Sequence, residues 1–530
     1  MDLKRTEEQR ILQQVRLDSL KAAEERNKWG QFATPPQLAR AILEYARLLW
    51  TSDNGPIRFL DPALGTGSFF SALAAVFPAH EIETAVGIEL DDQFATVAEE
   101  LWRLSGLTVV AGDFTKLEPP KQGRRFNLVV SNPPYVRHHH LDGSEKERLR
   151  GVVRQNHNIV LSGLAGLYCY FLLLCDSWLE PNGMGIWLIP SEFMDVNYGD
   201  GVKRYLTQKV ELLHVHRFSP SDVQFSDALV SSAIVVFRKI PPTTGHLVRM
   251  SFGGSLLTPD DEACVPLEEL CSSRKWTRYP QSRAPELTDV DGILLGDLFT
   301  IKRGLATGSN EFFIVGEELI KTWNIPDACL RPILPGPRHL SGDVVEADEY
   351  GVPQNCIRQW LIDTELPGDV IQGRYPRFWD YLDSGKDRKI PDSYLASRRR
   401  PWYSQERREP APFLFTYMGR SRNGGSPFRV IWNKSKATAH NVYLLLYPRA
   451  LLWRALQENP DLYPVLFEYL RKIESSQLVE EGRVYGGGLH KLEPRELARV
   501  SVVPLLTALS SRTELAQFVP GRQLSLVADR

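Results

Sequence analysis

Four apolar runs in the first third of the chain have the pattern of buried β-strands. They begin near residues 58, 84, 107 and 126, and the first leads through a loop of small residues into a helical pattern over 72–76. Each run ends at a polar side chain, and these four are Asp61, Glu89, Asp113 and Asn132. Ligands bind outside the carboxyl ends of parallel strands. The pattern therefore predicts an α/β fold with a ligand site at these four side chains.

The loop after the first run points to a nucleotide-like ligand. Its two glycines, Gly65 and Gly67, let the backbone approach a ligand at the start of the following helix. Glu89 suits the two hydroxyls of a ribose, and Asp113 can accept from an adenine amino group while Phe114 packs on the ring. The further glycine of the dinucleotide fingerprint is missing, so this loop alone leaves nicotinamide and flavin cofactors open.

The segment after the fourth run, Asn132-Pro133-Pro134-Tyr135, forms a slot for a planar amino group. Such an amino group on a purine or pyrimidine is a poor nucleophile because its lone pair is delocalised into the ring. The Asn132 side-chain oxygen and the Pro133 carbonyl can each accept one N–H as the transition state forms. The prolines stiffen the backbone, and Tyr135 offers a flat face for stacking. A stiff turn after a strand is the alternative reading of these four residues alone.

Together these motifs resemble the S-adenosylmethionine-dependent DNA amino-methyltransferases of the gamma arrangement, in which the cofactor motifs precede the catalytic motif. Upstream, residues 28–36 are similar to the family's amino-terminal cofactor motif, in which Thr34 touches the methionine carboxylate. From the residues alone, Thr34 before Pro35-Pro36 also predicts the N-cap of a helix over 37–49. The resemblance implies cofactor contacts from Thr34, Asp61, Ala63, Gly65, Glu89, Asp113, Phe114 and Pro134.

The same resemblance implies the reaction. S-adenosylmethionine would donate its methyl group to the N6 amino group of an adenine swung out of double-stranded DNA. Residues 223–237 are similar to a late motif whose aromatic residue packs against the extruded base, and Phe225 is at the matching position. Tyr135 and Phe225 are expected to sandwich the base, although Phe225 also fits an ordinary core phenylalanine. The expected catalytic residues are Asn132, Pro133, Tyr135 and Phe225, and no metal is expected.

Three alternatives to adenine N6 remain open. Cytosine N4 is the nearest, because the slot reads an exocyclic amine rather than a ring. Methyltransferases that act on a glutamine side chain of a translation factor, or on guanine N2 of ribosomal RNA, share the four-residue motif but normally lack a large carboxyl-terminal domain. The third alternative is a modification subunit that only binds DNA, against which the intact motifs argue.

The family's fold is a Rossmann-like, mixed seven-stranded sheet with helices on both faces, followed by an α+β target-recognition domain. Residues 1–245 are therefore expected to form the catalytic domain, 246–289 a connector and 290–530 the target-recognition domain. The first boundary lies where the segment 240–245, with Pro241-Pro242, breaks the last strand. Residues 295–313 resemble the opening of the target-recognition domain in one subgroup, and 485–491 its closing loop. Within the opening, 304–310 predict a flexible polar loop for a sugar-phosphate backbone, or a plain hairpin turn.

Charge distribution adds a candidate DNA contact. The formal net charge is only −2, but residues 373–423 hold twelve Lys/Arg against six Asp/Glu, including Arg398-Arg399-Arg400, interleaved with aromatic residues. Such a stretch can neutralise phosphates and read guanine edges, or it is a solvated surface with aromatics facing inward.

Composition agrees with a folded intracellular enzyme. The chain has 43% hydrophobic and 24% charged residues, which argues against disorder. Six cysteines without a C-x-x-C pair predict reduced thiols and no zinc. The charged start predicts no signal peptide, and the apolar run 161–174 is too short to cross a membrane. We expect a cytoplasmic, nucleoid-associated monomer whose possible partner is a cognate restriction endonuclease, because no stretch is left over for a fused nuclease domain.

Overall fold

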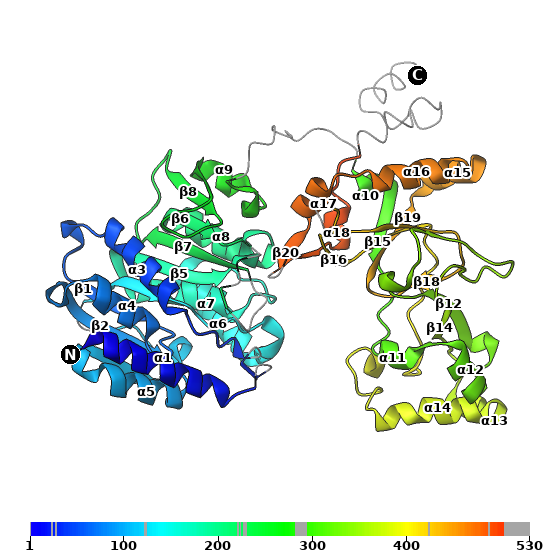
Figure 1. Cartoon of the computed structure of the whole chain (residues 1–530), viewed down its shortest axis with the longest axis horizontal. Coiled ribbons are helices and arrows are strands. Elements are labelled where there is room, and N and C mark those ends of the chain that lie inside the picture. The colour runs from blue at the N-terminus through cyan, green and yellow to red at the C-terminus, as the bar shows by residue number, and fades with distance from the viewer. Residues whose placement is uncertain are drawn as a thin grey trace, which may run out of the picture. The chain divides into compact units, whose positions relative to one another are not determined.

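The chain folds into two compact units (Figure 1). One comprises Met1–Glu286 with Tyr485–Gly487, and the other comprises Leu287–Val484 with Gly488–Arg530. The computed structural model describes residues 2–22, 25–26, 29–120, 124–219, 222, 224–225, 231–280, 294–421, 425–485 and 488–502. Residues 223 and 226–230 of the expected late motif, and 486–487 of the expected closing loop, lie outside the described residues.

A mixed sheet of nine strands forms the frame of the first unit, in the order β3, β2, β1, β4, β5, β7, β6, β8, β9. Its strands are β1 Ile57–Asp61, β2 Ile82–Glu89, β3 Leu107–Ala111, β4 Phe126–Ser131, β5 Leu179–Pro190, β6 Glu211–Arg217, β7 Ser232–Arg238, β8 Leu247–Phe252 and β9 Asp261–Pro266. The first five strands in this order are parallel, and β7 runs antiparallel to both β5 and β6. The expected mixed α/β methyltransferase sheet is confirmed.

Two of the nine strands come from the segment that was expected to be a connector. β8 pairs with β6 and β9 pairs with β8, so the sheet is larger than the predicted seven strands. The proline pair Pro241-Pro242 follows the end of β7 but does not end the domain. The reason is that Val248, Met250 and Val265 add buried side chains to the same hydrophobic core.

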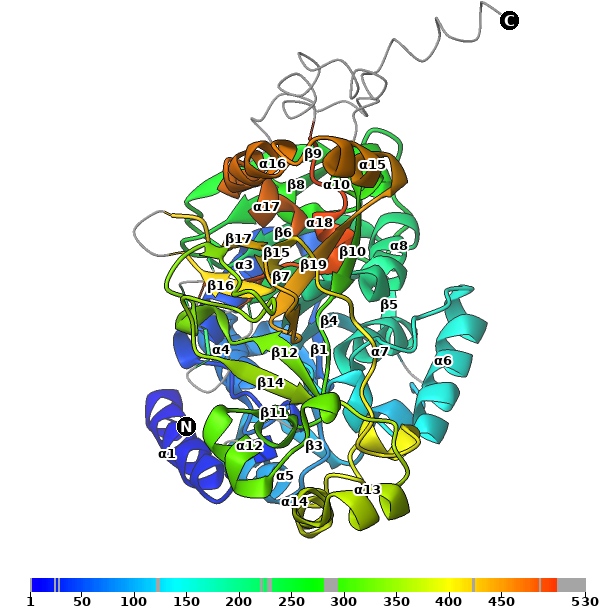
Figure 2. The ribbon, with the colours of Figure 1, turned by 90° about the vertical axis from the view of Figure 1, so that its right-hand side faces the viewer.

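Helices cover both faces of this sheet. They are α1 Leu3–Ser19, α3 Pro36–Leu49, α4 Ser68–Val76, α5 Asp92–Trp102, α6 Gly143–His157, α7 Leu167–Leu174, α8 Asp200–Gln208 and α9 Leu267–Ser272. Leu60 and Val129 share a core with α6, α7 and α8, whereas their neighbours Phe59 and Leu128 share another with α3, α4 and α5. Figure 2 shows α3 and α4 on one side of the strands and α6 and α7 on the other. Strands buried on both faces explain the continuous apolar runs in the sequence.

The second unit contains three smaller sheets. The largest has the order β10 Phe299–Arg303, β19 Tyr443–Pro448, β15 Phe413–Thr416, β17 Val430–Asn433, β13 Val344–Val345. The next is β11 Ile314–Val315, β14 Gln359–Ile362, β12 Leu330–Leu334, β18 Thr438–Ala439. The third is β16 Met418–Arg420, β21 Leu489–Lys491, β20 Arg483–Tyr485, of which the last residue, Tyr485, is grouped with the first unit. Its helices are α10 Leu295–Leu298, α11 Asn310–Phe313, α12 Glu317–Trp323, α13 Gly368–Arg374, α14 Pro376–Asp387, α15 Ala450–Glu458, α16 Leu462–Arg471, α17 Ser475–Glu481 and α18 Pro494–Leu497.

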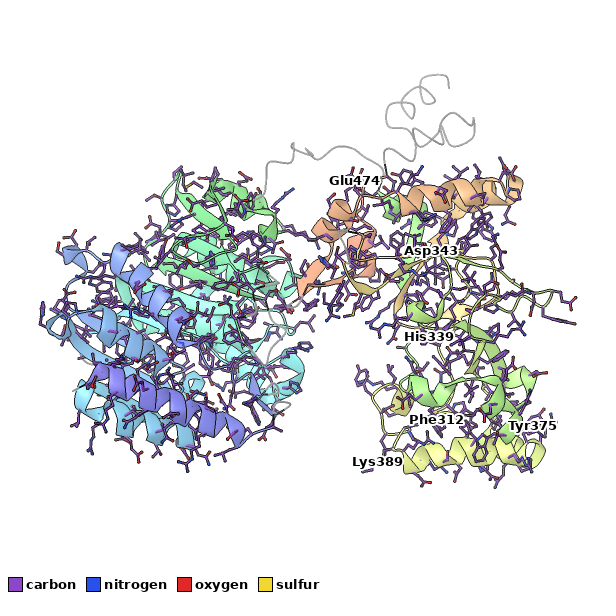
Figure 3. All side chains as sticks on the ribbon, viewed as in Figure 1. Phe312, His339, Asp343, Tyr375, Lys389 and Glu474 are labelled. Atoms are coloured by element: carbon purple, nitrogen blue, oxygen red, sulfur yellow. The ribbon has the colours of Figure 1, made fainter. Side chains whose placement is uncertain are left out.

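Aromatic packing holds the helical end of the second unit together. Phe312, labelled in Figure 3, stacks on Tyr381 of α14 with ring centroids 4.7 Å apart and ring planes 9° apart. Phe378, Tyr381 and Tyr403 of the expected basic segment are buried in this core. The aromatic residues of that segment therefore mostly face inward.

Within the described part of the chain, no helix has the length and apolar character needed to cross a membrane.

Candidate active site

Hydrogen bonds connect the carboxyl ends of four neighbouring strands. Ser131 Oγ, at the end of β4, donates to Asp61 Oδ1 at the end of β1 over 3.1 Å. The Gly65 amide donates to Glu89 Oε2 at the end of β2 over 2.7 Å. The Gly112 amide, just after β3, donates to the Glu89 carbonyl over 2.8 Å. The strand ends predicted from the apolar runs therefore converge on one edge of the sheet, although β3 ends two residues before the predicted position.

Asn132 is oriented by two acceptors in the segment before α3. Its Nδ2 donates to the Phe32 carbonyl oxygen over 2.9 Å and to Thr34 Oγ1 over 3.2 Å. A carbonyl oxygen can only accept, so the amide nitrogen must face it and Oδ1 must face the other way. Among the described residues no donor reaches Oδ1, although this atom is buried. An unpaired buried acceptor costs about 1–3 kcal/mol, and an N–H group of a ligand would remove that cost.

Thr34 does not cap the helix that follows it. The N-cap of α3 is Pro35, without a side-chain hydrogen bond. The Thr34 hydroxyl accepts from Asn132 instead, and its carbonyl accepts from Ser68 Oγ at the start of α4 over 3.0 Å. The N-cap prediction was wrong because Pro36 starts the helix with a fixed φ and without an N–H, which leaves one donor fewer to cap. Thr34 thus links the Asn132 side chain to the helix after the glycine loop.

Three aromatic rings pack together beside Asn132. Ring centroids of Phe32 lie 5.6 Å from those of Tyr135 and Phe225, and the last two are 5.9 Å apart. The Tyr135 hydroxyl donates to the Leu188 carbonyl over 3.1 Å, and burial raises the pKa of this phenol. The planes of Tyr135 and Phe225 meet at 86°, so both rings cannot stack face to face on one planar base. In this structure the two rings form a three-ring cluster with Phe32, and the sandwich around a base stays a prediction.

Gly30 holds the Phe32 segment against the Asn-Pro-Pro-Tyr segment. Its carbonyl accepts from the Tyr135 amide over 3.1 Å. It has φ of +63°, and a Cβ at this position would lie 2.3 Å from the Tyr135 nitrogen. Only glycine fits this close approach. The sequence prediction gave no role to Gly30 or Phe32, whose only signal was their place four and two residues before Thr34.

The acidic side chains at the sheet edge differ in the direction of their pKa shifts. Asp61 is fully buried, and burial raises its pKa to about 7 even though Oδ1 accepts from the Ala63 amide and Ser131. No donor from the described residues reaches Asp61 Oδ2. Burial likewise raises the pKa of Glu89. Burial opposes ionisation of Asp113 too, but hydrogen bonds, from the Thr115 side chain first, lower the pKa of that carboxyl.

Phe114 and Pro134 differ in exposure. Phe114 is 3% exposed, and its ring packs 5.1 Å from Phe171 and 5.4 Å from Trp178. It therefore belongs to the core beneath the sheet edge. Pro134 is partly exposed, next to the buried Pro133.

Among the described residues, no group of three His, Cys, Asp or Glu side chains is placed to hold a metal ion.

The loop and the basic segment of the second unit lie against each other. Arg399 donates to the Ala306 and Thr307 carbonyls, each over 2.7 Å. Thr307 is 1% exposed, and its hydroxyl donates to Asn310 Oδ1 over 2.7 Å. The loop at 304–310, expected to be flexible, is thus braced from within and by Arg399. Arg398 instead lies exposed over the ring of Tyr394, 3.7 Å from its centroid.

Comparisons with known proteins agree with this fold. A family model described as Eco57I restriction-modification methylase matches residues 84–224, and one described as type II methyltransferase M.Eco57I, C-terminal domain, matches residues 285–523. Type II methyltransferase M.XamI of Xanthomonas campestris pv. amaranthicola is 28% identical over 488 residues, which cover 90% of this chain and 85% of the relative. Type II methyltransferase M.AccI of Acinetobacter calcoaceticus is 24% identical, with 91% and 86% covered.

A solved structure shares the fold over most of the chain. The type IIL restriction-modification enzyme MmeI in complex with DNA superposes with a TM-score of 0.54 at 13% sequence identity. The superposition covers 92% of this chain and 69% of that chain. Both units therefore take part in the likeness.

Proposed function

We propose that this chain, which belongs to the DNA methyltransferases of type II restriction-modification systems, methylates the N6 amino group of adenine in double-stranded DNA. One observation carries the proposal: the buried Asn132 Oδ1 lacks a donor among the described residues, while Nδ2 is fixed by Phe32 and Thr34. An acceptor held in this way is preorganised for the N–H of an exocyclic amine.

The cofactor is S-adenosylmethionine, and the residues at the sheet edge suit it. Both Glu89 oxygens accept backbone N–H groups, from Gly65 and Asp91, and each keeps a further lone pair for a ribose hydroxyl. The ionised Asp113 suits an adenine amino group. Asp61 Oδ2 is a buried acceptor without a donor among the described residues. We assign cofactor contacts to Thr34, Asp61, Ala63, Gly65, Glu89, Asp113 and Pro134. Phe114 was also expected to contact the cofactor, but its ring is buried against Phe171 and Trp178, so we leave it in the core.

The methyl group is supplied by the cofactor's sulfonium, and this chain's residues activate the amine that receives it. Asn132 Oδ1 and the Pro133 carbonyl each accept one N–H, which favours a tetrahedral nitrogen with a localised lone pair. The same two acceptors stabilise the positive charge that develops on the nitrogen. Tyr135 positions the ring of the base by contact with its own ring. No covalent bond to the enzyme forms, and the product proton leaves to water.

We assign target recognition to the second unit, and the match of residues 285–523 supports this assignment. Arg398 and Tyr394 present a guanidinium and an aromatic face outward, since Tyr394 is 69% exposed. Such a pair suits a phosphate or a base edge. A large unit of this kind also favours DNA over a glutamine side chain or ribosomal RNA. We expect a monomer that works with a separate cognate restriction endonuclease.

Modified-base sequencing tests the proposal. Unmethylated plasmid DNA is incubated with purified protein and S-adenosylmethionine, and the product is sequenced by a method that reports N6-methyladenine and N4-methylcytosine separately. We expect N6-methyladenine at one short sequence. N4-methylcytosine at such a sequence would show that the target base is cytosine, the nearest alternative, because the acceptors bind an exocyclic amine and do not distinguish the ring that carries it. Label from the methyl donor that enters RNA or protein but never DNA would refute the proposal.

A further inference from the structure

The amino-terminal helix α1 reaches the glycine loop through a buried arginine. Arg10 is 2% exposed, and its Nη1 donates to Thr66 Oγ1 over 3.1 Å. Its Nε and Nη2 donate to the two carboxylate oxygens of Glu7 over 2.7 and 2.6 Å. The Thr66 hydroxyl in turn donates to Gln14 Oε1 over 2.8 Å. A buried guanidinium is costly unless its donors are used, so this contact fixes the position of Thr66 relative to α1.

Other contacts hold the same loop from the opposite side. Trp102, at the end of α5, donates from Nε1 to the Thr66 carbonyl over 2.9 Å. Gly67 has φ of +90°, and a Cβ there would lie 2.7 Å from Trp102 Nε1. The Gly65 amide is bound by Glu89. The backbone of the loop is thus fixed by α5 and β2, whereas the Thr66 hydroxyl is bound by α1 alone among the described residues.

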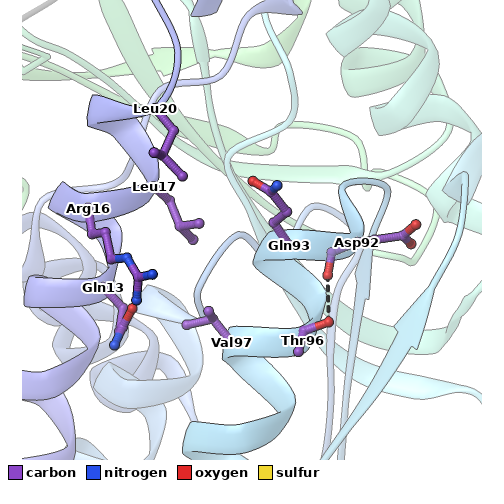
Figure 4. Close-up of a pocket in the computed structure, with 8 residues that line it drawn as sticks. All are labelled: Gln13, Arg16, Leu17, Leu20, Asp92, Gln93, Thr96 and Val97. Atoms are coloured by element: carbon purple, nitrogen blue, oxygen red, sulfur yellow. Dashed lines mark hydrogen bonds between the residues drawn. The ribbon is translucent and has the colours of Figure 1, made fainter.

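Helix α1 is placed for this role by its packing on α5. Figure 4 shows Leu17 of α1 and Val97 of α5 pointing toward one another in the groove between the two helices. Leu17 is buried there. Beyond the helix end, Lys21 donates to Asp91 Oδ2 over 2.5 Å and to Gln31 Oε1 over 3.1 Å. The Asp91 amide donates to Glu89, and Gln31 directly precedes Phe32. Side chains of the amino-terminal segment therefore contact three neighbours of the site: the glycine loop, Asp91 and Gln31.

We propose that α1 is a positioning element for the cofactor, in which Arg10 acts through Thr66 to hold residues 65–67 in the conformation that binds S-adenosylmethionine. This inference rests on the cofactor contact assigned to Gly65. A loop that is already ordered loses less conformational entropy when the ligand binds. Loss of the Arg10–Thr66 contact should therefore weaken cofactor affinity by roughly 10- to 100-fold, the range for one hydrogen bond to a charged group.

The role of the Thr66 hydroxyl can be tested with two conservative variants. Thr66→Val removes the hydroxyl at almost constant volume, and Thr66→Ser keeps it. Isothermal titration of the full-length protein with S-adenosylmethionine, without DNA, should show weaker binding for Thr66→Val and nearly unchanged binding for Thr66→Ser. Equal affinities in these two variants would overturn the proposal. Because the measurement needs no methylated product, it is independent of whether adenine or cytosine is the target base.

Two arginine variants of α1, one at a buried position and one at an exposed position, provide a test and its control. Arg10→Ala should weaken cofactor binding, whereas Arg16→Ala, which changes an exposed residue of the same helix, should not. The double variant Arg10→Ala/Thr66→Val should bind the cofactor about as weakly as the single variant with the lower affinity, since both single changes remove the same Arg10–Thr66 contact. In steady-state assays, KM for the cofactor should rise while KM for DNA and kcat at saturating cofactor stay unchanged. A fall in thermal stability with unchanged cofactor affinity would show a purely structural role and refute the proposal.

Discussion

Asn132 Nδ2 donates to the Phe32 carbonyl oxygen over 2.9 Å, across 100 positions of sequence. This contact decides which end of the amide faces Phe32, because the carbonyl can only accept. The segment before α3 therefore sets the orientation of a side chain at the end of β4. Gly30 of the same segment adds a second contact, because its carbonyl accepts from the Tyr135 amide. The proposed catalytic slot is thus built from two segments that are far apart in the chain.

Replacement of Asn132 by alanine should abolish most of the activity. Oδ1, which no donor among the described residues reaches, is one of the two acceptors assigned to the amine. Loss of one preorganised partner typically lowers kcat by about 10²–10³-fold. Single-turnover methylation at saturating DNA and cofactor measures the effect. Titrations with both ligands serve as the control, and both affinities should stay within about threefold of the unmodified protein. A variant with nearly full activity would show that the amide is not the acceptor.

The ring and the hydroxyl of Tyr135 can be separated by two variants. Tyr135→Phe loses the hydrogen bond to the Leu188 carbonyl, so it should lower stability by about 1 kcal/mol and leave kcat within a few-fold. Tyr135→Ala removes the ring that contacts Phe32 and Phe225, so methylation should fall far more. Thermal unfolding and single-turnover rates of both variants check this. Equal loss of activity in the two would assign the function to the hydroxyl.

Asp61 should make the free protein less stable as the pH rises from about 4 to about 7. Burial raises its pKa from 3.8 to about 7, so within this window the folded state keeps a proton that the unfolded chain has lost. Stability then decreases by about 1.4 kcal/mol per pH unit at most, and the penalty is constant above the folded pKa. Asp61→Asn does not titrate and keeps an acceptor for the Ala63 amide. The unfolding free energy of Asp61→Asn minus that of the unmodified protein should rise between pH 4 and 7 and then level off. A difference that does not change with pH would contradict this prediction.

Two neighbouring arginines should have opposite effects. Arg398→Ala removes an exposed guanidinium above Tyr394, so DNA affinity should fall and the salt dependence of binding should decrease by about one unit of slope, with stability unchanged. Arg399→Ala leaves the Ala306 and Thr307 carbonyls without this donor, so it should destabilise the protein by about 1–3 kcal/mol. Fluorescence anisotropy at several salt concentrations and thermal unfolding separate the two. An Arg398→Ala protein with normal affinity and salt dependence would remove this residue from the DNA contact.

Local sequence patterns were sufficient for the first four strands and for the chemistry of their ends. β1 and β4 are buried on both faces, and such strands give continuous apolar runs that need no knowledge of their neighbours. The polar residue after each run lies at the same edge because parallel strands share a direction. The acceptor oxygens and the aromatic ring of the Asn-Pro-Pro-Tyr segment are properties of the residue types, so the sequence alone identifies them.

The extent of the sheet depended on long-range packing. Pro241-Pro242 has the local signature of a domain end, yet β8 and β9 continue the sheet because their buried side chains complete its core. Thr34 has the local signature of an N-cap, yet its hydroxyl accepts from Asn132. In both cases a tertiary contact outweighs the local preference.

The sequence by itself determined the fold class, the sheet edge that carries Asp61, Glu89, Asp113 and Asn132, and the type of chemistry that these residues offer. Tertiary structure alone decided which end of the Asn132 amide faces Phe32, how Phe32, Tyr135 and Phe225 meet, and that Arg10 binds Thr66. The physical reason is that a periodic pattern reports burial along one element, whereas a hydrogen bond between residues 56 or 100 positions apart depends on how whole elements pack.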